Sequence, residues 1–148
     1  MFFFQLPRLP ESWARANDFA RIAKMYKETS VSSDTFTDED IEVYKEALRQ
    51  PGALTGGINY YRANVFESLF RGGVETPDDG RIRVPTMFIY GEQDQAILPE
   101  TVRGLNRFID APYTELRIPD SAHWVQNEAV AEVNEALLRF LADGSTAN

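Results

Sequence analysis

One histidine and one aspartate have the types and spacing of the base and acid of a hydrolytic site. His123, the only histidine among the 148 residues, lies in the segment Asp-Ser-Ala-His-Trp at 120–124, and Asp94 ends the segment Tyr-Gly-Glu-Gln-Asp at 90–94. A carboxylate beside an imidazole fixes the tautomer of the ring and stabilises the imidazolium that forms when the ring accepts a proton. Taken singly, each residue also fits a structural role, as a half-buried histidine or a turn aspartate. Taken together, they predict a catalytic pair.

Short apolar runs precede both residues and are typical of strands that are buried on both faces. The first run occupies residues 84–90 and is ended by a glycine, and the second occupies residues 114–118 and is stopped by a proline. In open α/β sheets, catalytic groups gather beyond the carboxyl ends of the strands. We therefore expect Asp94 and His123 to lie on the same rim of a sheet.

Helical patterns alternate with these strands. Pro99 is expected to start a helix with Val102, Leu105 and Phe108 on its apolar side. The last helix is expected from six apolar residues at helical spacing: Val130, Val133, Ala136, Leu137, Phe140 and Leu141. Residues 84–148 thus predict an α/β fold, a βαβα unit with two parallel strands and a right-handed crossover. Because two strands leave an apolar edge unpaired, we also expect self-association or pairing with a partner that supplies further strands.

Residues 1–75 are predicted to be helical, and a polar linker at 76–83 separates them from the βαβα unit. Thr37, three residues before Asp40, predicts the capped start of a second helix. The first helix is expected from a stripe of apolar residues that would place Trp13 in the core: Trp13, Ala16, Phe19, Ala20, Ala23 and Tyr26. The third is expected from near residue 53 to residue 70 and carries five large apolar residues: Tyr60, Tyr61, Val65, Leu69 and Phe70.

Composition and charge exclude several classes of protein. A net charge of −8 argues against nucleic-acid binding, which needs a basic face. With one histidine, no cysteine and no glycine-rich phosphate loop, the chain is expected to use no metal and no nucleotide cofactor. The apolar start at residues 1–7 is too short to span a membrane and lacks the basic region of a signal peptide. We expect a cytoplasmic protein without membrane attachment, for which the absence of cysteine is suitable.

Residues 84–141 resemble the C-terminal end of an α/β-hydrolase, in the branch of epoxide hydrolases and haloalkane dehalogenases. The resemblance is carried by Val-Pro-Thr-Met-Phe-Ile-Tyr-Gly-Glu-Gln-Asp at 84–94 and Pro-Asp-Ser-Ala-His-Trp at 119–124, and by three segments similar to that branch's helical cap: Phe-Gln-Leu-Pro at 4–7, Leu-Pro-Glu at 9–11 and Asn-Tyr-Tyr-Arg at 59–62. It implies a partial α/β-hydrolase fold, with a helical cap followed by the last two strands of the core. Ala122 departs from the family, which usually has glycine before the histidine.

The resemblance implies a hydrolysis in two steps. An aspartate nucleophile attacks an epoxide carbon and forms an ester, which water activated by the histidine–acid pair then hydrolyses. Matched by motif, His123 is the base, Asp94 the acid that orients it, and Tyr61 the proton donor to the epoxide oxygen, although Tyr61 fits a core position equally well. Phe3, Tyr60 and Trp124 are candidate pocket residues, with packing favoured for Tyr60 and Trp124.

Phe3 stands where epoxide hydrolases commonly have a second tyrosine, and this departure leaves other reactions open. A haloalkane or haloacid dehalogenase uses a related hydrolysis, and a serine esterase places its acid and base on the same rim. In each case the substrate of the complete enzyme is expected to be small, and for the epoxide or halide reactions it is hydrophobic.

The nucleophile is not found in the chain. There is no Gly-x-Ser-x-Gly elbow, and with one histidine, already assigned, there is no His-Asp-Trp-Gly equivalent before the cap. The first residues fall where the family's cap begins, so the nucleophile strand and most of the sheet are expected upstream of Met1. We therefore expect the C-terminal part of an epoxide-hydrolase-like enzyme, inactive alone. The alternatives are a non-catalytic binding module and one half of a split enzyme whose partner chain carries the nucleophile.

Overall fold

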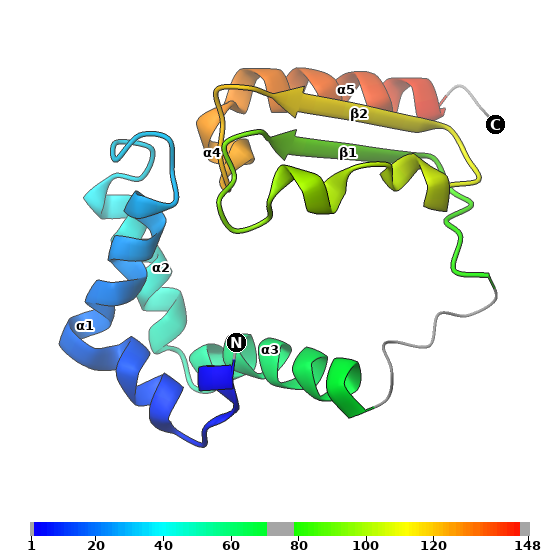
Figure 1. The fold of residues 1–148 in the computed structure, drawn as a ribbon. Helices are drawn as coiled ribbons and strands as arrows, with labels where there is room; N and C mark the ends of the chain where they lie inside the picture. Colours follow the sequence, from blue (N-terminus) through cyan, green and yellow to red (C-terminus); the bar gives the residue numbers. More distant parts are fainter. Residues whose placement is uncertain (1, 71–78, 146–148) are drawn as a thin grey trace. The chain divides into compact units, whose positions relative to one another are not determined.

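The structure, a computed structural model, describes residues 2–70 and 79–145, with the backbone alone at 64–70 and 144–145. The described residues form two compact units (Figure 1). The helical unit is made by residues 2–26 and 36–70, and the sheet unit by residues 27–35 and 79–145. Residues 76–78 of the predicted linker lie outside this description, as do the side chains of Val65, Leu69 and Phe70, which were predicted as apolar residues of the third helix.

The helical unit contains a short 3-10 turn and three helices. These are η1 (Phe2–Gln5), α1 (Leu9–Glu28, whose last two residues belong to the sheet unit), α2 (Asp38–Arg49) and α3 (Ala53–Phe70). The predicted cap of α2 is confirmed, because the Asp40 amide donates to Thr37 Oγ1 at 3.1 Å while the Thr37 amide donates to Asp40 Oδ2 at 2.9 Å. The predicted span of α3 is confirmed as well.

The core of the helical unit differs from the predicted stripe. Its buried residues come from α1 and α3, and three partly buried residues pack against them: Ala14, Phe19, Leu54 and Ile58, with Phe4, Ile22 and Leu48. The α1 backbone leaves helical geometry at residues 16–19, where Asn17, Asp18 and Phe19 have positive φ. A helical period cannot continue through such a break, so Trp13 does not share a face with Phe19. The prediction of Trp13 in the core is wrong, since it is 43% exposed.

Tyr60 is also more exposed than predicted. Leu54 and Ile58 turn one side of α3 toward the core, and the helical period of 3.6 residues puts Tyr60 on the opposite side from Ile58. Its exposed fraction is 69%, so Tyr60 is not part of the core of this unit.

The sheet unit is built on two parallel strands, as predicted. β1 (Thr86–Gly91) and β2 (Tyr113–Ile118) pair in register from Thr86 opposite Tyr113 to Gly91 opposite Ile118. The first strand begins two residues later than the apolar run, because Pro85 has no amide hydrogen to donate. Before it, an isolated parallel bridge joins Ile82 to Ile109. The in-register pairing brings the carboxyl ends of both strands to one rim.

The connection between the strands is not the single helix that was predicted. It consists of two 3-10 turns, η2 (Pro99–Val102) and η3 (Leu105–Phe108). Arg103 is extended, and Gly104 has the left-handed conformation with φ +70°. Two such residues in succession break the hydrogen-bond ladder that a continuous helix requires.

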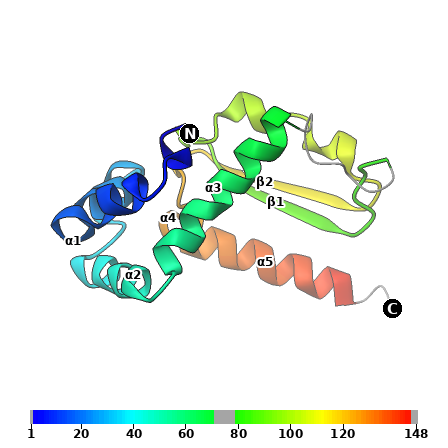
Figure 2. The same cartoon turned by 90° about the horizontal axis from the view of Figure 1, so that it is seen from below.

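Helices α4 (Val125–Glu128) and α5 (Val130–Ser145) complete the sheet unit. Figures 1 and 2 show α5 along one face of the two strands and the 3-10 turns on the other. The core here joins β2 to the start of α5, with further apolar residues packed around it: Ile118, Ala129 and Val133, then Ile89, Leu116 and Val125. Of the predicted apolar face of α5, Val133 is buried, whereas Leu141 is 64% exposed. No helix in residues 2–70 or 79–145 has the length and apolar character needed to cross a membrane.

Candidate active site

The loops that follow the two strands bring Asp94 and His123 together. Asp94 lies just beyond the end of β1, His123 lies just beyond the end of β2, and His123 Nδ1 is 2.9 Å from Asp94 Oδ2. The Asp94 side chain is buried, whereas the His123 side chain is 31% exposed. Because an ionised carboxylate only accepts hydrogen bonds, Nδ1 is the protonated nitrogen of this pair and Nε2 remains free to accept a proton.

Asp94 is held as a carboxylate by its own loop. Its Oδ1 accepts hydrogen bonds from the Ala96 amide at 2.7 Å and the Ile97 amide at 3.0 Å. Burial tends to raise the pKa of the Asp94 carboxyl, but the hydrogen bonds from the Ile97 amide, His123 and the Ala96 amide outweigh burial and hold that pKa below its ordinary value. The buried Tyr90 hydroxyl donates to the Ile97 carbonyl at 2.6 Å and so fixes the far side of the loop.

The loop after β1 that carries Asp94 (the acid loop) and the loop after β2 that carries His123 (the base loop) lie in direct backbone contact. The amides of Glu92 and Gln93 donate to the carbonyls of Ile118 and Ser121 at 3.0 and 2.9 Å. At Gly91 a Cβ atom would come within 2.6 Å of the Ser121 carbonyl oxygen, and closer still to that of Ala122. Sequence reasoning treated this glycine only as the end of a strand, whereas its role is to let the two loops approach.

Trp124 lies beside the imidazole. Its ring centroid is 5.0 Å from that of His123, with the two planes at 85°, and its Nε1 donates to Thr29 Oγ1 at 2.7 Å. The ring is half-buried. Trp124 therefore limits the movement of the imidazole on one side and joins it to residues 27–35.

Glu128 is a residue of this rim that sequence reasoning missed. Its carboxylate accepts hydrogen bonds from the Ser121 hydroxyl and the amides of Ala122 and Val31, so it contacts the base loop directly. A single acidic residue in a short helix carries no signal in one sequence, because such a position is commonly solvated. Only its contacts distinguish it.

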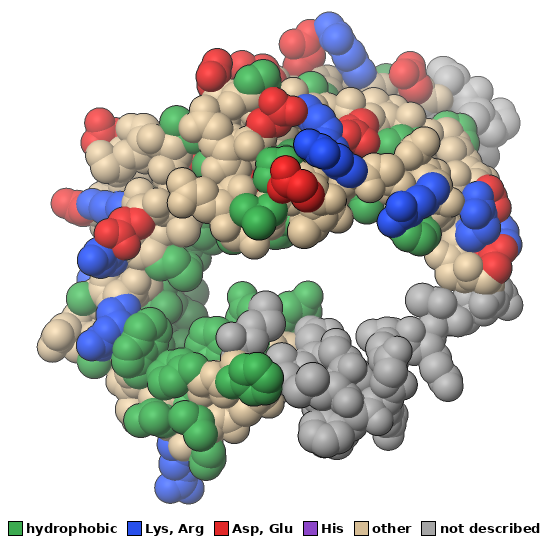
Figure 3. Space-filling model, viewed as in Figure 1, with side chains coloured by type: hydrophobic (Ala, Val, Ile, Leu, Met, Phe, Trp, Pro, Cys, Tyr) green, Lys and Arg blue, Asp and Glu red, His purple; other side chains and the backbone are tan. Residues whose placement is uncertain are grey.

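Tyr61, Tyr60 and Phe3 belong to the helical unit. The Tyr61 ring stacks on Phe4 with centroids 5.1 Å apart, Tyr60 meets Tyr61 edge-on, and Phe3 lies against Phe4 and the Trp13 ring. Tyr61 is 39% exposed, and within the described ranges its hydroxyl has no hydrogen-bond partner. On the face in Figure 3, hydrophobic side chains gather over this unit. Five aromatic rings therefore form one continuous row of contacts, in the order Trp13, Phe3, Phe4, Tyr61 and Tyr60.

Arg62 holds this aromatic group in place. Its guanidinium donates to the carbonyls of Phe4 and Leu6 at 2.8 and 2.9 Å and to Glu11 Oε1 at 2.8 Å. A further bond at 3.0 Å reaches Asn59 Oδ1. The bond to Arg62 holds the pKa of the Glu11 carboxyl below its ordinary value. One side chain thus fixes η1 against α3, which sets the contact between Phe4 and Tyr61.

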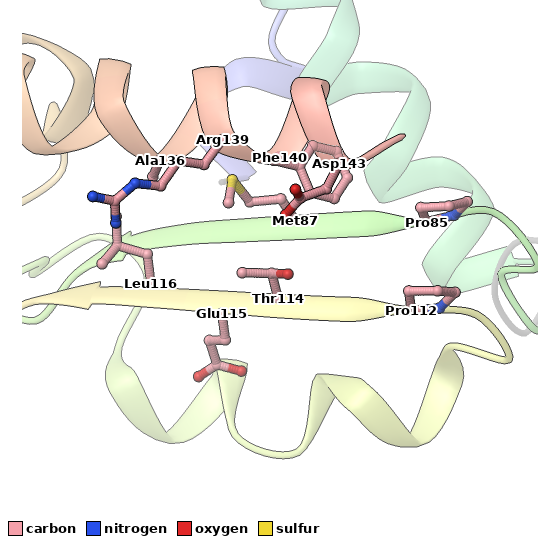
Figure 4. A pocket seen from close by; sticks show the side chains of 10 residues that line it. All are labelled: Pro85, Met87, Pro112, Thr114, Glu115, Leu116, Ala136, Arg139, Phe140 and Asp143. Atoms are coloured by element: carbon pink, nitrogen blue, oxygen red, sulfur yellow. The ribbon is translucent and has the colours of Figure 1, made fainter. Parts of the chain in front are cut away.

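A hollow of about 580 Å³ lies between α5 and the two strands, but it is not the site of the pair. Its lining is largely apolar, and Figure 4 shows Met87, Leu116 and Phe140 around it. Pro85 and Pro112, which precede the two strands, also line it. It therefore follows the strands from their amino ends, whereas Asp94 and His123 follow the carboxyl ends. As for metals, no group of three or more His, Asp or Glu side chains suited to an ion occurs in the part of the chain that the structure describes.

Comparisons with known proteins agree with this geometry. A family model described as "alpha/beta hydrolase fold" matches residues 3–130. Epoxide hydrolase 3 of Mus musculus is 31% identical over 144 residues, which cover 97% of this chain and 37% of that protein. The AB hydrolase superfamily protein YfhM of Bacillus subtilis (strain 168) is 32% identical over 139 residues, which cover 94% of this chain and 46% of that protein.

The same agreement holds for solved structures. The crystal structure of a Bacillus megaterium epoxide hydrolase in complex with an inhibitor matches with a TM-score of 0.79 at 23% identity, over 95% of this chain and 50% of the other. The match establishes a common fold. The chain spans half or less of the length of each of these three proteins.

Proposed function

Since the chain belongs to the α/β-hydrolase fold family, in its epoxide hydrolase branch, we propose that it supplies the water-activating part of an epoxide hydrolase. The observation that carries the proposal is the 2.9 Å contact between His123 Nδ1 and Asp94 Oδ2. Nε2 of His123 accepts a proton from water as the water oxygen attacks the carbonyl carbon of an alkyl-enzyme ester. The Asp94 carboxylate stabilises the imidazolium that results.

The ester forms on an aspartate nucleophile that these 148 residues do not supply. The sequence has no His-Asp-Trp-Gly segment of the kind that carries the aspartate nucleophile in this branch, because its one histidine precedes Trp124, and the chain spans only part of the length of its relatives. We propose that a strand of the nucleophile-bearing part pairs with the edge of β1 that β2 does not occupy. Such pairing would add strands to the sheet and cover the backbone groups of that edge. The chain alone is then inactive as a hydrolase.

Tyr61 is proposed as the proton donor to the epoxide oxygen. Tyr61 is 39% exposed and its hydroxyl has no partner among the described residues, and a phenol stabilises a developing alkoxide by donating a hydrogen bond. Phe3, Tyr60 and Trp124 are proposed as substrate-pocket residues of the complete enzyme, whose substrate would be a small hydrophobic epoxide.

Dehalogenation is the second candidate, and Phe3 is the observation that favours it. A halide leaves as an anion and needs no proton, so a phenyl group at this position would not impair that reaction, whereas epoxide opening would lose one donor. The histidine–aspartate pair would act in the same hydrolytic step.

A fusion experiment tests the proposal. The pure chain is assayed with styrene oxide, and so is a fusion in which the N-terminal part of a relative such as Epoxide hydrolase 3 of Mus musculus precedes it. We expect diol only from the fusion, and no diol when the fusion carries His123→Ala. The exposed Glu132→Gln serves as the control and should retain activity. Turnover by the chain alone, or full activity of the His123→Ala fusion, contradicts the proposal.

A further inference from the structure

The carboxylate of Glu128 joins the loop that carries His123 to a distant part of the sequence. Its Oε2 accepts hydrogen bonds from the Ser121 hydroxyl at 2.8 Å and from the Ala122 amide at 2.6 Å. Its Oε1 accepts a third, from the Val31 amide at 2.7 Å. All four residues belong to the sheet unit. One side chain therefore binds the two residues that come immediately before the histidine.

Ser121 is held from both sides. Its carbonyl accepts the Gln93 amide of the acid loop at 2.9 Å, and its hydroxyl donates to Glu128. The residue is fully buried, with 0% of its surface exposed. A buried hydroxyl that loses its acceptor is unfavourable, so the position of Ser121 depends on the Glu128 oxygen. The base loop is thus fixed between the acid loop and the carboxylate of Glu128.

We propose that Glu128 is a positioning residue for His123. By holding Ser121 and Ala122, it keeps the imidazole in the orientation in which Nδ1 donates to Asp94 and Nε2 is left to accept a proton. Glu128 acts through these two neighbours and takes no part in bond making. The inference rests on the proposed role of His123, although its test requires no turnover.

Glutamine cannot replace this carboxylate. It offers one acceptor oxygen and one NH2 donor, whereas the three bonds need acceptors on both sides. In Glu128→Gln, either the Val31 amide or the donors of Ser121 and Ala122 must face the NH2 group. Rotation of the amide does not relieve both conflicts, so the base loop loses part of its support.

The single histidine makes the orientation of the imidazole directly measurable. Nitrogen NMR of the full chain reports one imidazole, and at a pH where the ring is neutral the Nδ1–H tautomer should predominate in the wild-type protein. We expect Glu128→Gln to lower the ratio of the Nδ1–H to the Nε2–H tautomer about tenfold or more. The reason is that a displaced imidazole loses the hydrogen bond from Nδ1 to the charged Asp94 carboxylate. Glu132→Gln makes the same chemical change at an exposed site and should leave the ratio unchanged.

Three results would overturn the proposal. If Glu128→Gln lowers the melting temperature but keeps the wild-type ratio, Glu128 only stabilises the fold. If Glu132→Gln changes the ratio equally, the effect comes from net charge. If Glu128→Gln does not fold, Ser121→Ala decides, since it removes one of the three bonds; a folded Ser121→Ala protein with the wild-type ratio refutes the role. Hydrolysis by the fusion is measured separately, so failure of the proposed function remains distinguishable.

Discussion

The backbone amide of Gln93 donates to the backbone carbonyl of Ser121 across 2.9 Å, which joins the loop of the acid to the loop of the base. This bond lies outside the regular ladder between β1 and β2, and it continues their pairing past the last residue of each strand. The distance between Asp94 and His123 is therefore set by the sheet as well as by the two side chains.

Gly91→Ala should separate the two loops. The added methyl group would meet the carbonyl oxygens of Ser121 and Ala122, both backbone atoms that cannot rotate away. We expect the free energy of unfolding in urea to fall by about 1–3 kcal/mol, the range for overpacked sites. The matched control is Gly56→Ala, where nothing lies within 4 Å of the new atom, and a gain of about 0.5–1 kcal/mol is expected there. Equal stability of Gly91→Ala and the wild-type protein would contradict the close approach.

Asp94→Asn should change how stability depends on pH. The pKa of the Asp94 carboxyl is lowered in the folded protein, so the stabilisation is fully present above the unfolded value of about 3.9 and is lost as the pH falls through the folded value. We expect the wild-type protein to exceed Asp94→Asn in unfolding free energy at neutral pH, and the difference to shrink below about pH 4.

Denaturation of both proteins at a series of pH values measures this difference, in which carboxyls common to both cancel. Asp120→Asn, an exposed site on the same rim, is the control and should change stability at neutral pH by less than about 0.5 kcal/mol. A difference between wild type and Asp94→Asn that stays constant from neutral to strongly acidic pH would count against the Asp94 contacts.

Arg62→Lys should weaken the attachment of η1. A lysine cannot reproduce the fork that reaches the Phe4 and Leu6 carbonyls and Glu11 together. We expect a loss of about 1.5–3 kcal/mol in unfolding free energy. Arg103→Lys is the matched change at a side chain that is 72% exposed and has one ion pair at 3.8 Å, and it should be neutral. Equal changes in unfolding free energy for Arg62→Lys and Arg103→Lys would show that the Arg62 hydrogen bonds do not stabilise the fold.

Tyr61→Phe separates the two candidate reactions. In the active fusion, removal of the hydroxyl should lower epoxide turnover about 10²-fold or more, the contribution of a general acid, while halide hydrolysis is retained. Tyr44→Phe, at a half-buried ring of the helical unit that stacks on Tyr26 and has no proposed role in the pocket, is the control and should act like wild type. Phe3→Tyr supplies the hydroxyl that is missing at that position and should raise epoxide turnover. Unchanged epoxide turnover in Tyr61→Phe would remove that residue from the proposed mechanism.

The pairing of Asp94 with His123 could be expected from the sequence because its determinants are local. Each residue follows an apolar run, and parallel strands in register bring both run ends to one rim. The capped start of α2 is also local, since Thr37 and Asp40 bind each other's backbone amides. Such features depend on a few neighbouring residues, so they can be predicted from a single sequence.

The features that could not be expected depend on backbone geometry or on distant partners. The left-handed conformation of Gly104 breaks the connecting helix, and positive φ at Asn17 breaks α1, although the apolar spacing continues through both. Glu128 and Val31 are 97 residues apart in the sequence. No period or motif relates them, so the support of the base loop becomes visible only in the fold.

Residues 27–35 pack with the sheet although α2, and all but the last two residues of α1, pack in the other unit. A protein engineer who isolated residues 79–148 with a single cut would remove Thr29 and Val31, the partners of Trp124 and Glu128. The excised piece would retain Asp94 and His123 but lack residues 27–35, which bind Trp124 and Glu128 beside His123. To isolate the sheet unit intact, residues 27–35 must be linked to residues 79–148 in a single rearranged chain.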